Sequence, residues 1–225
     1  MAEADFAIEV LLDPKRSPLF AALLSDVLDG MGHWRQALPA RIRPLDDDLL
    51  MIGRARTAAY LEVYSHTEGD NPYELEIALI DDLKPGEIPV FACGTSGRVA
   101  PWGELLSTAA RARGAVGAVM DGAVRDIKAI RAMGFPVFHG GIATLDSKGR
   151  GRVAAIDVPI ECGGVAVSPG DLIVGDADGV VVVPRAAEAE ALRRAAVKLV
   201  GERVTLRELQ EGQLLADVFA RHGVL

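Results

Sequence analysis

The sequence between residues 72 and 139 alternates helical patterns with short apolar runs, and this alternation constrains the fold more than any other feature. The patterns indicate helix 72–83, strand 88–92, helix 103–113, strand 115–120, helix 123–133 and strand 134–139. Strands that alternate with helices of this length are typical of parallel sheets whose crossover helices cover them. We therefore expect an α/β core over this part of the chain.

The second half of the chain follows a different pattern. Four short runs rich in Val, Ile and Gly are separated by Gly and Pro turns, which favours antiparallel hairpins or a small barrel-like sheet. They are 153–158, 164–167, 171–175 and 179–183. A helical region runs from Pro184 to about Gln210, with an expected break at Gly201. We expect one αβ domain over residues 1–184 and a C-terminal helical arm over 185–225 that packs on a neighbouring subunit.

Charge and cysteine usage exclude several classes of protein. The net charge of −8 argues against a general nucleic-acid binder, which needs a basic excess to neutralise phosphates. Cys93 and Cys162 lack metal-site spacing and are expected to be free thiols in a reducing compartment. Residues 1–10 lack the basic region of a secretion signal, and no apolar stretch is long enough for a membrane span. We expect a cytoplasmic protein with no membrane partner.

Arg125 and Asp126 are the first candidate site. The buried run 115–120 predicts a strand, Gly122 a tight turn, and 123–133 a helix with Arg125 and Asp126 in its first turn. Open α/β sheets bind ligands at this C-terminal edge of the strands. The alternative is that Asp126 is only a favourable acid in the first helical turn and Arg125 a surface side chain.

The Gly-rich loop 94–103 is the second candidate site, because it leads into the N-terminus of a helix. The first N–H groups of that helix belong to Gly103, Glu104, Leu105 and Leu106, and such groups bind anions such as a small carboxylate. No Gly-Lys-Ser/Thr sequence follows, so nucleotide binding is poorly supported. An ordinary long connection remains the alternative interpretation.

Together the two sites favour chemistry on a 2-oxo acid. The helix N-terminus would bind the carboxylate, Arg125 would pair with a carboxylate or carbonyl oxygen, and Asp126 would bind Mg²⁺ or Mn²⁺ directly or through waters. A metal-chelated 2-oxo acid becomes more acidic at C3, and its enolate is stabilised electrostatically. The candidate site contains no lysine, so an imine route is not favoured.

Several stretches resemble the family of 4-hydroxy-4-methyl-2-oxoglutarate aldolases, which also contains the regulator of ribonuclease activity A. The resemblance extends from about residue 20 to 212 and is strongest in 102–114 and in Asp121-Gly122-Ala123-Val124-Arg125-Asp126. Residues 162–165, 169–171 and 175–180 resemble a second signature of the family, and residues 25–30 resemble its N-terminal helix. The resemblance implies a compact αβ sandwich, similar to swivelling β/β/α domains, that assembles as trimers or hexamers. It also implies a class II pyruvate aldolase that uses magnesium or another divalent ion, and often oxaloacetate decarboxylation.

The same resemblance implies roles for individual residues. Arg125 matches the arginine that contacts pyruvate, Asp126 the metal-bearing aspartate, and Gly103 to Leu106 the carboxylate cradle. Glu202 matches an acid on the last long helix that reaches a neighbouring subunit's site, where it would assist a metal-bound water as the base. Val200 stands where the family's aldolases carry a first acid, so only half of that acidic pair is present.

Other residues and other functions stay open. Asp121 is a candidate support for Arg125 or for a metal-bound water, and His139 is a candidate only if it is not a structural core histidine. The segment 139–151 departs from many relatives and could line the distal part of the substrate site or be a surface turn. The alternative functions are a non-catalytic regulator of an RNA-processing enzyme and a lyase or hydratase acting on a sugar-acid derivative.

Overall fold

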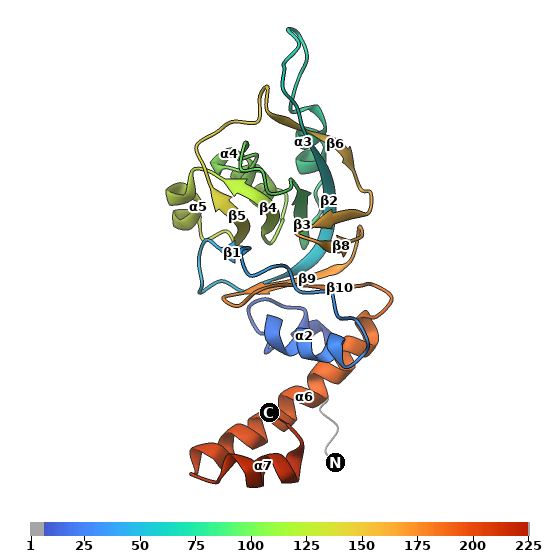
Figure 1. Cartoon of the computed structure of the whole chain (residues 1–225), viewed down its shortest axis with the longest axis vertical. Coiled ribbons are helices and arrows are strands. Elements are labelled where there is room, and N and C mark those ends of the chain that lie inside the picture. The colour runs from blue at the N-terminus through green and yellow to red at the C-terminus, as the bar shows by residue number, and fades with distance from the viewer. Residues whose placement is uncertain (1–6, 225) are drawn as a thin grey trace.

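The computed structural model describes residues 7–224 and shows a mixed sheet with helices on both sides of it (Figure 1). Expectations that concern residues 1–6 and 225 lie outside the described residues. In chain order the elements are α1 (Ile8–Leu11), α2 (Ala21–Asp29), β1 (Arg43–Pro44), β2 (Met51–Glu62), α3 (Glu74–Asp81), β3 (Glu87–Ala92), α4 (Glu104–Ala112), β4 (Ala118–Val124), α5 (Ile127–Met133), β5 (Val137–Ile142), β6 (Gly151–Ile156), β7 (Ile160–Cys162), β8 (Val165–Val167), β9 (Leu172–Asp176), β10 (Gly179–Val183), α6 (Glu188–Gln210) and α7 (Leu215–His222).

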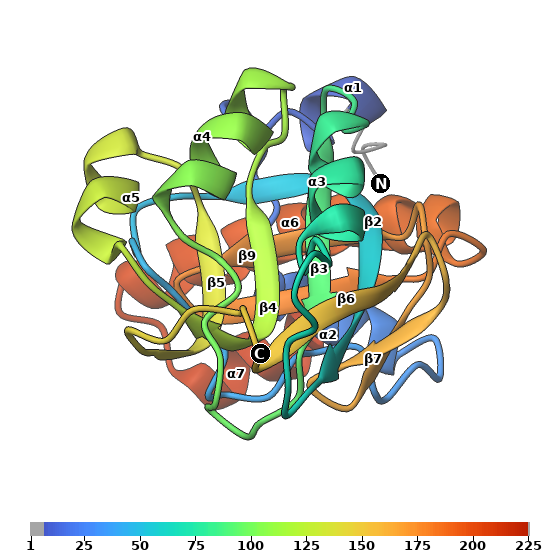
Figure 2. The same cartoon turned by 90° about the horizontal axis from the view of Figure 1, so that it is seen from above.

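Four parallel strands form the centre of the main sheet, in the spatial order β5-β4-β3-β2. The crossover helices α3, α4 and α5 lie side by side on one face of these strands, as Figure 2 shows. The parallel α/β core predicted from the alternating patterns is therefore confirmed. The carboxyl ends of β4 and β5 meet at one edge, where loops from different parts of the chain converge.

The sheet curls because β2 changes its partner partway along its length. On one edge it pairs with β3 over residues 54–59. On the other edge it pairs with β9 over residues 51–54 and with β6 over residues 58–62, and this second pairing contains a register shift between Ala59 and Tyr60. A shift of this kind bends a strand and increases its twist. The resulting curved sheet encloses an apolar core against β7 and β8 that includes Phe138, Ile88 and Cys162.

Of the antiparallel hairpins predicted for the second half of the chain, the one between 171–175 and 179–183 is present as β9 and β10. The run 153–158 is β6, which pairs with β2 instead, and the run 164–167 is β8, whose partner β7 was not predicted. β7 and β8 pair around Gly163 and Gly164, whose φ angles are +59° and +84°. Helices α2 and α6 cover β9 and β10 on the side away from α4 (Figure 1), through a cluster that includes Leu24, Val181 and Leu192.

The helical arm consists of α6 and α7. The predicted break at Gly201 is wrong, since α6 continues through it to Gln210; one glycine in a long helix costs only about 1 kcal/mol relative to alanine. α7 folds back on α6, where Arg221 and His222 contact Glu208 at 2.6 and 3.0 Å. None of the helices between residues 7 and 224 is both long and apolar enough to cross a membrane.

Candidate active site

The junction between β4 and α5 holds the first pair of predicted site residues. β4 continues through Gly122 to Val124, and α5 begins only at Ile127, so the predicted turn at Gly122 and the predicted start of the helix are both wrong. Gly122 serves a different purpose: a Cβ there would lie 2.7 Å from Cys93 Cβ. Arg125 and Asp126 therefore lie in the short connection, and Asp126 adopts a left-handed conformation with φ of 57°.

The loop before α4 lies directly against this junction. The Arg125 N–H donates to the Trp102 carbonyl oxygen at 2.9 Å, and Trp102 forms an isolated parallel bridge with Val124. Trp102 is fully buried, packs edge-on against Phe91, and donates from Nε1 to Ser107 Oγ at 2.8 Å. These contacts hold the N-terminus of α4 beside Arg125 and Asp126.

Gly103 is the N-cap of α4 and allows the two segments to approach closely. A Cβ at this position would lie 2.5 Å from Asp126 Oδ2 and 3.2 Å from Arg125 Cγ, so a side chain would collide with the site. Asp126 Oδ2 accepts a hydrogen bond from the Glu104 N–H at 3.2 Å. A carboxylate thus already lies at the N-terminus of α4, the position that favours anions. The predicted convergence of Arg125, Asp126 and Gly103 to Leu106 is present.

Arg125 lies between two carboxylates. Its Nε is 3.8 Å from Asp126 Oδ2, and its Nη1 is 3.2 Å from Asp146 Oδ1. Tyr73 donates its hydroxyl hydrogen to Asp146 Oδ2 at 2.6 Å. Burial and this hydrogen bond raise the pKa of Tyr73 to about 12, so the phenol stays a donor. Burial opposes ionisation of Asp146, but the hydrogen bonds from Tyr73 and from backbone N–H groups lower its pKa.

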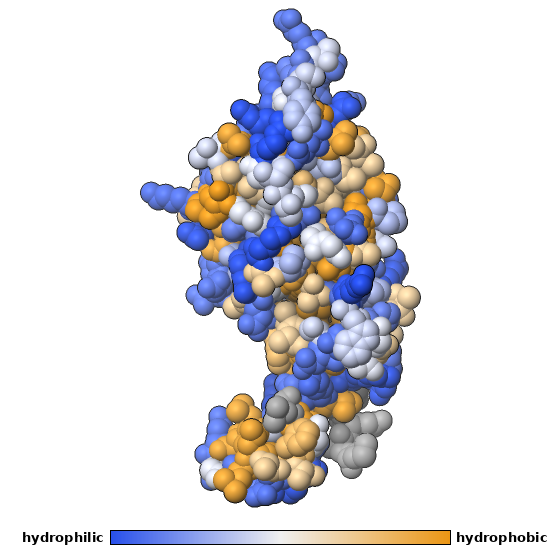
Figure 3. Space-filling view, in the orientation of Figure 1, coloured by the Kyte–Doolittle hydropathy of each residue, from blue (hydrophilic) through white to orange (hydrophobic). Residues whose placement is uncertain are grey.

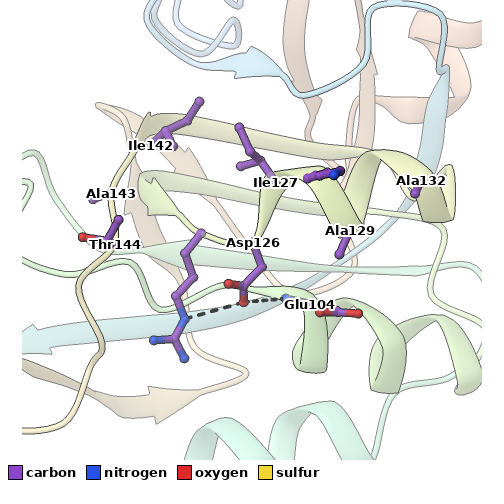
Figure 4. A pocket seen from close by; sticks show the side chains of 10 residues that line it. Glu104, Asp126, Ile127, Ala129, Ala132, Ile142, Ala143 and Thr144 are labelled. Atoms are coloured by element: carbon purple, nitrogen blue, oxygen red, sulfur yellow. Dashed lines mark hydrogen bonds and ion pairs between the residues drawn. The ribbon is translucent and has the colours of Figure 1, made fainter.

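Two cavities meet at Arg125 and Asp126, which line both. The inner cavity has a volume of about 300 Å³ and is lined by Tyr73, Glu76, Ile77, Pro101, Gly103, Leu105, Leu106, Arg125, Asp126, Asp146 and Ser147. The outer cavity, of about 750 Å³, is mostly apolar and is lined by Glu104, Arg125, Asp126, Ile127, Lys128, Ala129, Ala132, Ile142, Ala143 and Thr144 (Figure 4). Asp146 and Ser147 belong to the segment 139–151, which therefore contributes to the wall of the inner cavity.

Glu76 is a residue of this site that the sequence reasoning missed. It is only 4% exposed, and its Oε2 has no hydrogen-bond partner among the described residues. Burial, and secondarily the charge of Asp146, raise its pKa to about 7, while Arg125 acts in the opposite direction. The neighbouring Ile77 is 46% exposed, although it is apolar. The buried face of α3 contains Glu76, Leu79 and Ile80, a helical spacing that could have identified the glutamate.

Asp121 acts as a tether between loops. Its side chain is buried, with 4% of the residue exposed. Its Oδ1 accepts hydrogen bonds from the N–H groups of Cys93 at 2.6 Å and Gly94 at 3.0 Å. Its Oδ2 accepts a hydrogen bond from the Gly163 N–H at 2.9 Å. Its backbone carbonyl accepts from Arg41 Nη1 at 2.7 Å. These bonds point toward the loops after β3 and β7 rather than toward Arg125. Asp121 therefore positions the sheet edge on which the site is built.

His139 and Glu202 lie apart from Arg125 within the chain. His139 is buried in β5, where burial lowers its pKa, and it lines neither cavity. Glu202 lies on α6, 3.2 Å from Lys198 Nζ, and lines a separate cavity beside Phe20 and α7. α6 covers the far side of β9 and β10 from α4 (Figure 1). A single chain does not bring Glu202 to the candidate site.

The residues present are compatible with a hydrated divalent cation. Mg²⁺ is usually held by one or two carboxylates together with several waters. The side chain of Asp126 is 45% exposed, and Glu104 lines the outer cavity next to it (Figure 4). Within residues 7–224, no group of three or more His, Cys, Asp or Glu side chains is arranged to hold a metal ion. A cation at Asp126 would thus keep most of its ligands as water or substrate oxygens.

Comparisons with known proteins agree on one family. A family model described as "RraA-like: Aldolase/RraA" matches residues 21–182. A Halalkalibacterium halodurans protein named "Putative 4-hydroxy-4-methyl-2-oxoglutarate aldolase" is 36% identical over 210 residues, which are 93% of this chain and 91% of that protein. A Thermus thermophilus protein named 4-hydroxy-4-methyl-2-oxoglutarate aldolase is 29% identical over 66% of this chain and 85% of its own length.

The fold has a solved relative from Streptomyces coelicolor. The crystal structure of RraAS2, described as an unusual member of the RNase ES inhibitor RraA protein family, aligns with a TM-score of 0.73 and 25% identity. The alignment covers 92% of this chain and 98% of that chain.

Proposed function

The chain belongs to the RraA-like family, and we propose that it is a divalent-metal-dependent lyase that cleaves a 4-hydroxy-2-oxo acid and releases pyruvate. The observation that carries this proposal is the convergence of the Arg125 guanidinium, the Asp126 carboxylate and the N-terminus of α4 on one cavity. Decarboxylation of oxaloacetate is a related activity of the same site, because both reactions pass through the enolate of pyruvate.

The chain's own residues bind and orient the oxo acid. The N–H groups at the start of α4, including those of Leu105 and Leu106, bind its carboxylate, and the Arg125 guanidinium donates hydrogen bonds to its keto oxygen. Asp146 orients Arg125 through the 3.2 Å ion pair. A divalent cation at Asp126, Mg²⁺ or Mn²⁺, supplies Lewis-acid polarisation of the keto group when bound.

The cleavage balances as a retro-aldol reaction. A base removes the proton of the 4-hydroxyl group, the C3–C4 bond breaks, and its electron pair moves into the C2–C3 enolate. Arg125 stabilises the negative charge that develops on the enolate oxygen. A proton added at C3 then gives pyruvate, and the C4 fragment leaves as an aldehyde or ketone. We assign the assistance of proton removal to Glu202 of a neighbouring subunit.

This assignment of Glu202 requires an oligomer, and we propose a trimer or hexamer in which residues 185–225 pack on a neighbour. The arm exposes apolar side chains, among them Val197, Leu206, Leu214, Leu215 and Phe219. Apolar side chains cover much of the end of the arm that projects from the body (Figure 3). Apolar patches of this kind mark contact surfaces in many proteins.

Release of pyruvate tests the proposed activity. The purified protein is incubated with Mg²⁺ or Mn²⁺ and a panel of 4-hydroxy-2-oxo acids, oxaloacetate and sugar-acid derivatives, and pyruvate is measured with lactate dehydrogenase. We expect release from at least one oxo acid, loss of activity with a chelator, and recovery when the cation is restored. Absence of pyruvate release across the whole panel with either cation would rule out the proposal.

A second candidate function is a protein-binding regulator of an RNA-processing enzyme, supported by the likeness to RraAS2. A regulator would bind such an enzyme through surface contacts. Its binding would not depend on Arg125 or Asp126. A pull-down in which the Arg125→Ala variant still captures a ribonuclease, together with the absence of pyruvate release, would favour this function.

A further inference from the structure

We propose that Glu76 is a specificity-determining residue whose buried carboxyl group contacts the part of the substrate beyond the pyruvyl unit and favours an uncharged, hydroxylated tail over a second carboxylate. The inference deepens the proposed lyase function and rests on it. It follows from the shape of the inner cavity, the charges that line it and the unpartnered oxygen of Glu76.

The inner cavity leads from the start of α4 to Glu76. Leu105 and Leu106, whose N–H groups would hold the substrate carboxylate, line the inner cavity and not the outer one. The same cavity is also lined by Glu76 of α3, together with Tyr73 and Asp146. A substrate that binds with its carboxylate at α4 and its keto group at Arg125 therefore extends its remaining carbons toward α3.

The charges around this path disfavour a second carboxylate. Of the residues that line the inner cavity, Glu76, Asp126 and Asp146 are acidic, and Arg125 is the one cation. Arg125 already contacts Asp126 at 3.8 Å and Asp146 at 3.2 Å. When substrate binds, the Arg125 guanidinium would also donate hydrogen bonds to the keto oxygen. A second carboxylate near α3 would meet the like charges of Glu76 and Asp146 with no free cationic side chain to pair with, whereas hydroxyl groups avoid this repulsion.

Glu76 also has a hydrogen-bonding position that a ligand can fill. Its Oε2 is buried and has no partner among the residues that the structure describes, which is unfavourable for a polar atom. A hydroxyl group both donates and accepts, so it can pair with either protonation state of the carboxyl group. A substrate hydroxyl group that hydrogen-bonds to Oε2 would remove the cost of leaving this buried atom unpaired. This gain would add to the preference for a hydroxylated tail.

The pH dependence of this preference follows from the groups around Glu76. Burial and Asp146 raise its pKa to about 7, and Arg125 opposes them. Glu76 in turn acts electrostatically on Tyr60, Tyr73 and Cys93. Burial keeps the pKa values of these three groups high, so they stay neutral near pH 7. Between pH 6 and pH 8 Glu76 therefore gains negative charge, and its discrimination against a carboxylate increases.

The test uses the aldol direction of the reaction, with two acceptors of similar size. Glycolaldehyde has a hydroxylated tail and glyoxylate has a carboxylate, and each is added to pyruvate in the presence of Mg²⁺. We expect the ratio of kcat/KM for glycolaldehyde to that for glyoxylate to fall about tenfold in Glu76→Gln, mainly through the acceptor KM. In the wild-type protein the ratio should rise from pH 6 to pH 8, and in Glu76→Gln it should stay flat.

Glu74→Gln is the matched control, because Glu74 lies on the same helix with an exposed side chain. It should leave the acceptor ratio and its pH profile as in the wild type. If both acceptors react but Glu76→Gln leaves the ratio unchanged, the inference is wrong and the lyase function stands. If the wild-type protein adds pyruvate to neither acceptor but releases pyruvate from an oxo acid of the panel, the inference is wrong and the lyase function stands. If the panel releases no pyruvate either, both fail.

Thermal unfolding provides a readout that needs no activity. The raised pKa of Glu76 means that its ionisation opposes folding, so wild-type stability falls as the pH rises from the ordinary value of 4.5 through about 7. The Tm of Glu76→Gln relative to wild type should therefore increase between pH 5 and pH 8, whereas that of Glu74→Gln should not. An unchanged Tm difference would show that Glu76 is not the buried titrating group that the inference requires.

Discussion

Replacing Arg125 with alanine is expected to lower kcat/KM for pyruvate formation by about a thousandfold, which is the scale seen when a donor to a developing oxyanion is removed. The guanidinium is the one cation that lines the inner cavity, so no neighbouring side chain can take its place at the enolate oxygen. Its side chain is 36% exposed and its ion pairs are at the surface, so the fold should be little affected. Coupled pyruvate assays and thermal unfolding measure the two effects.

Arg113→Ala is the matched control for this substitution. Arg113 ends α4 and is exposed, with an ion pair of 3.6 Å to Asp81. The control should keep wild-type activity, and its free energy of unfolding should lie within about 0.5 kcal/mol of the wild-type value. Pyruvate formation by Arg125→Ala at a rate close to that of Arg113→Ala would remove Arg125 from the mechanism.

Replacing Asp121 with alanine is expected to destabilise the protein by about 4 kcal/mol. The substitution leaves the N–H groups of Cys93, Gly94 and Gly163 without their carboxylate partner in a buried position. Removing one partner of a buried, charge-assisted hydrogen-bond cluster typically costs about 3 to 5 kcal/mol. Urea denaturation monitored by circular dichroism measures the loss.

Two further variants define the cause of this effect. Asp121→Asn keeps one carbonyl acceptor and should lose less stability than Asp121→Ala. Asp70→Ala, at an exposed position in the loop before α3, should stay near wild type. If Asp121→Ala unfolds at the same urea concentration as Asp70→Ala, the tether between the loops after β3 and β7 is not what holds this edge of the sheet.

Much of the fold could be predicted from residue patterns, because the parallel strands are buried on both faces and the crossover helices are amphipathic. The runs 88–92 and 115–120 are continuous and apolar, and such runs identify central strands. The hairpin of β9 and β10 could be located from the turn that ends at Gly179, which adopts positive φ. These signals are local, so they can be recognised in the sequence without knowledge of the tertiary contacts.

The errors arose where a long-range contact decides the meaning of a residue. Local rules favour a turn at Gly122, but this residue lies within β4. A glycine is needed there because Cys93 leaves no room for a Cβ. Asp126 adopts a left-handed conformation and lies against Gly103, which comes from another part of the chain. Glu76 was missed for another reason: a glutamate on a helix is usually exposed, so its helical spacing with Leu79 and Ile80 was not given weight.

The candidate site was partly accessible from the sequence because its main elements are short motifs at strand and helix ends. Arg125, Asp126 and the start of α4 could be placed near one another from the order of the strands alone. The contact between Tyr73 and Asp146 could not be predicted, because the hydrogen bond that joins them spans 73 residues.

Exchange of the methyl protons of pyruvate in D₂O is the most direct test of the central claim that this cavity forms the enolate of pyruvate. Pyruvate has no tail, so the measurement is independent of the natural substrate and of Glu76. We predict that the methyl signal in the proton NMR spectrum decays in the presence of the wild-type protein and Mg²⁺ or Mn²⁺, and persists with Arg125→Ala or a chelator. A methyl signal that decays no faster with the wild-type protein and saturating cation than in buffer would contradict the account.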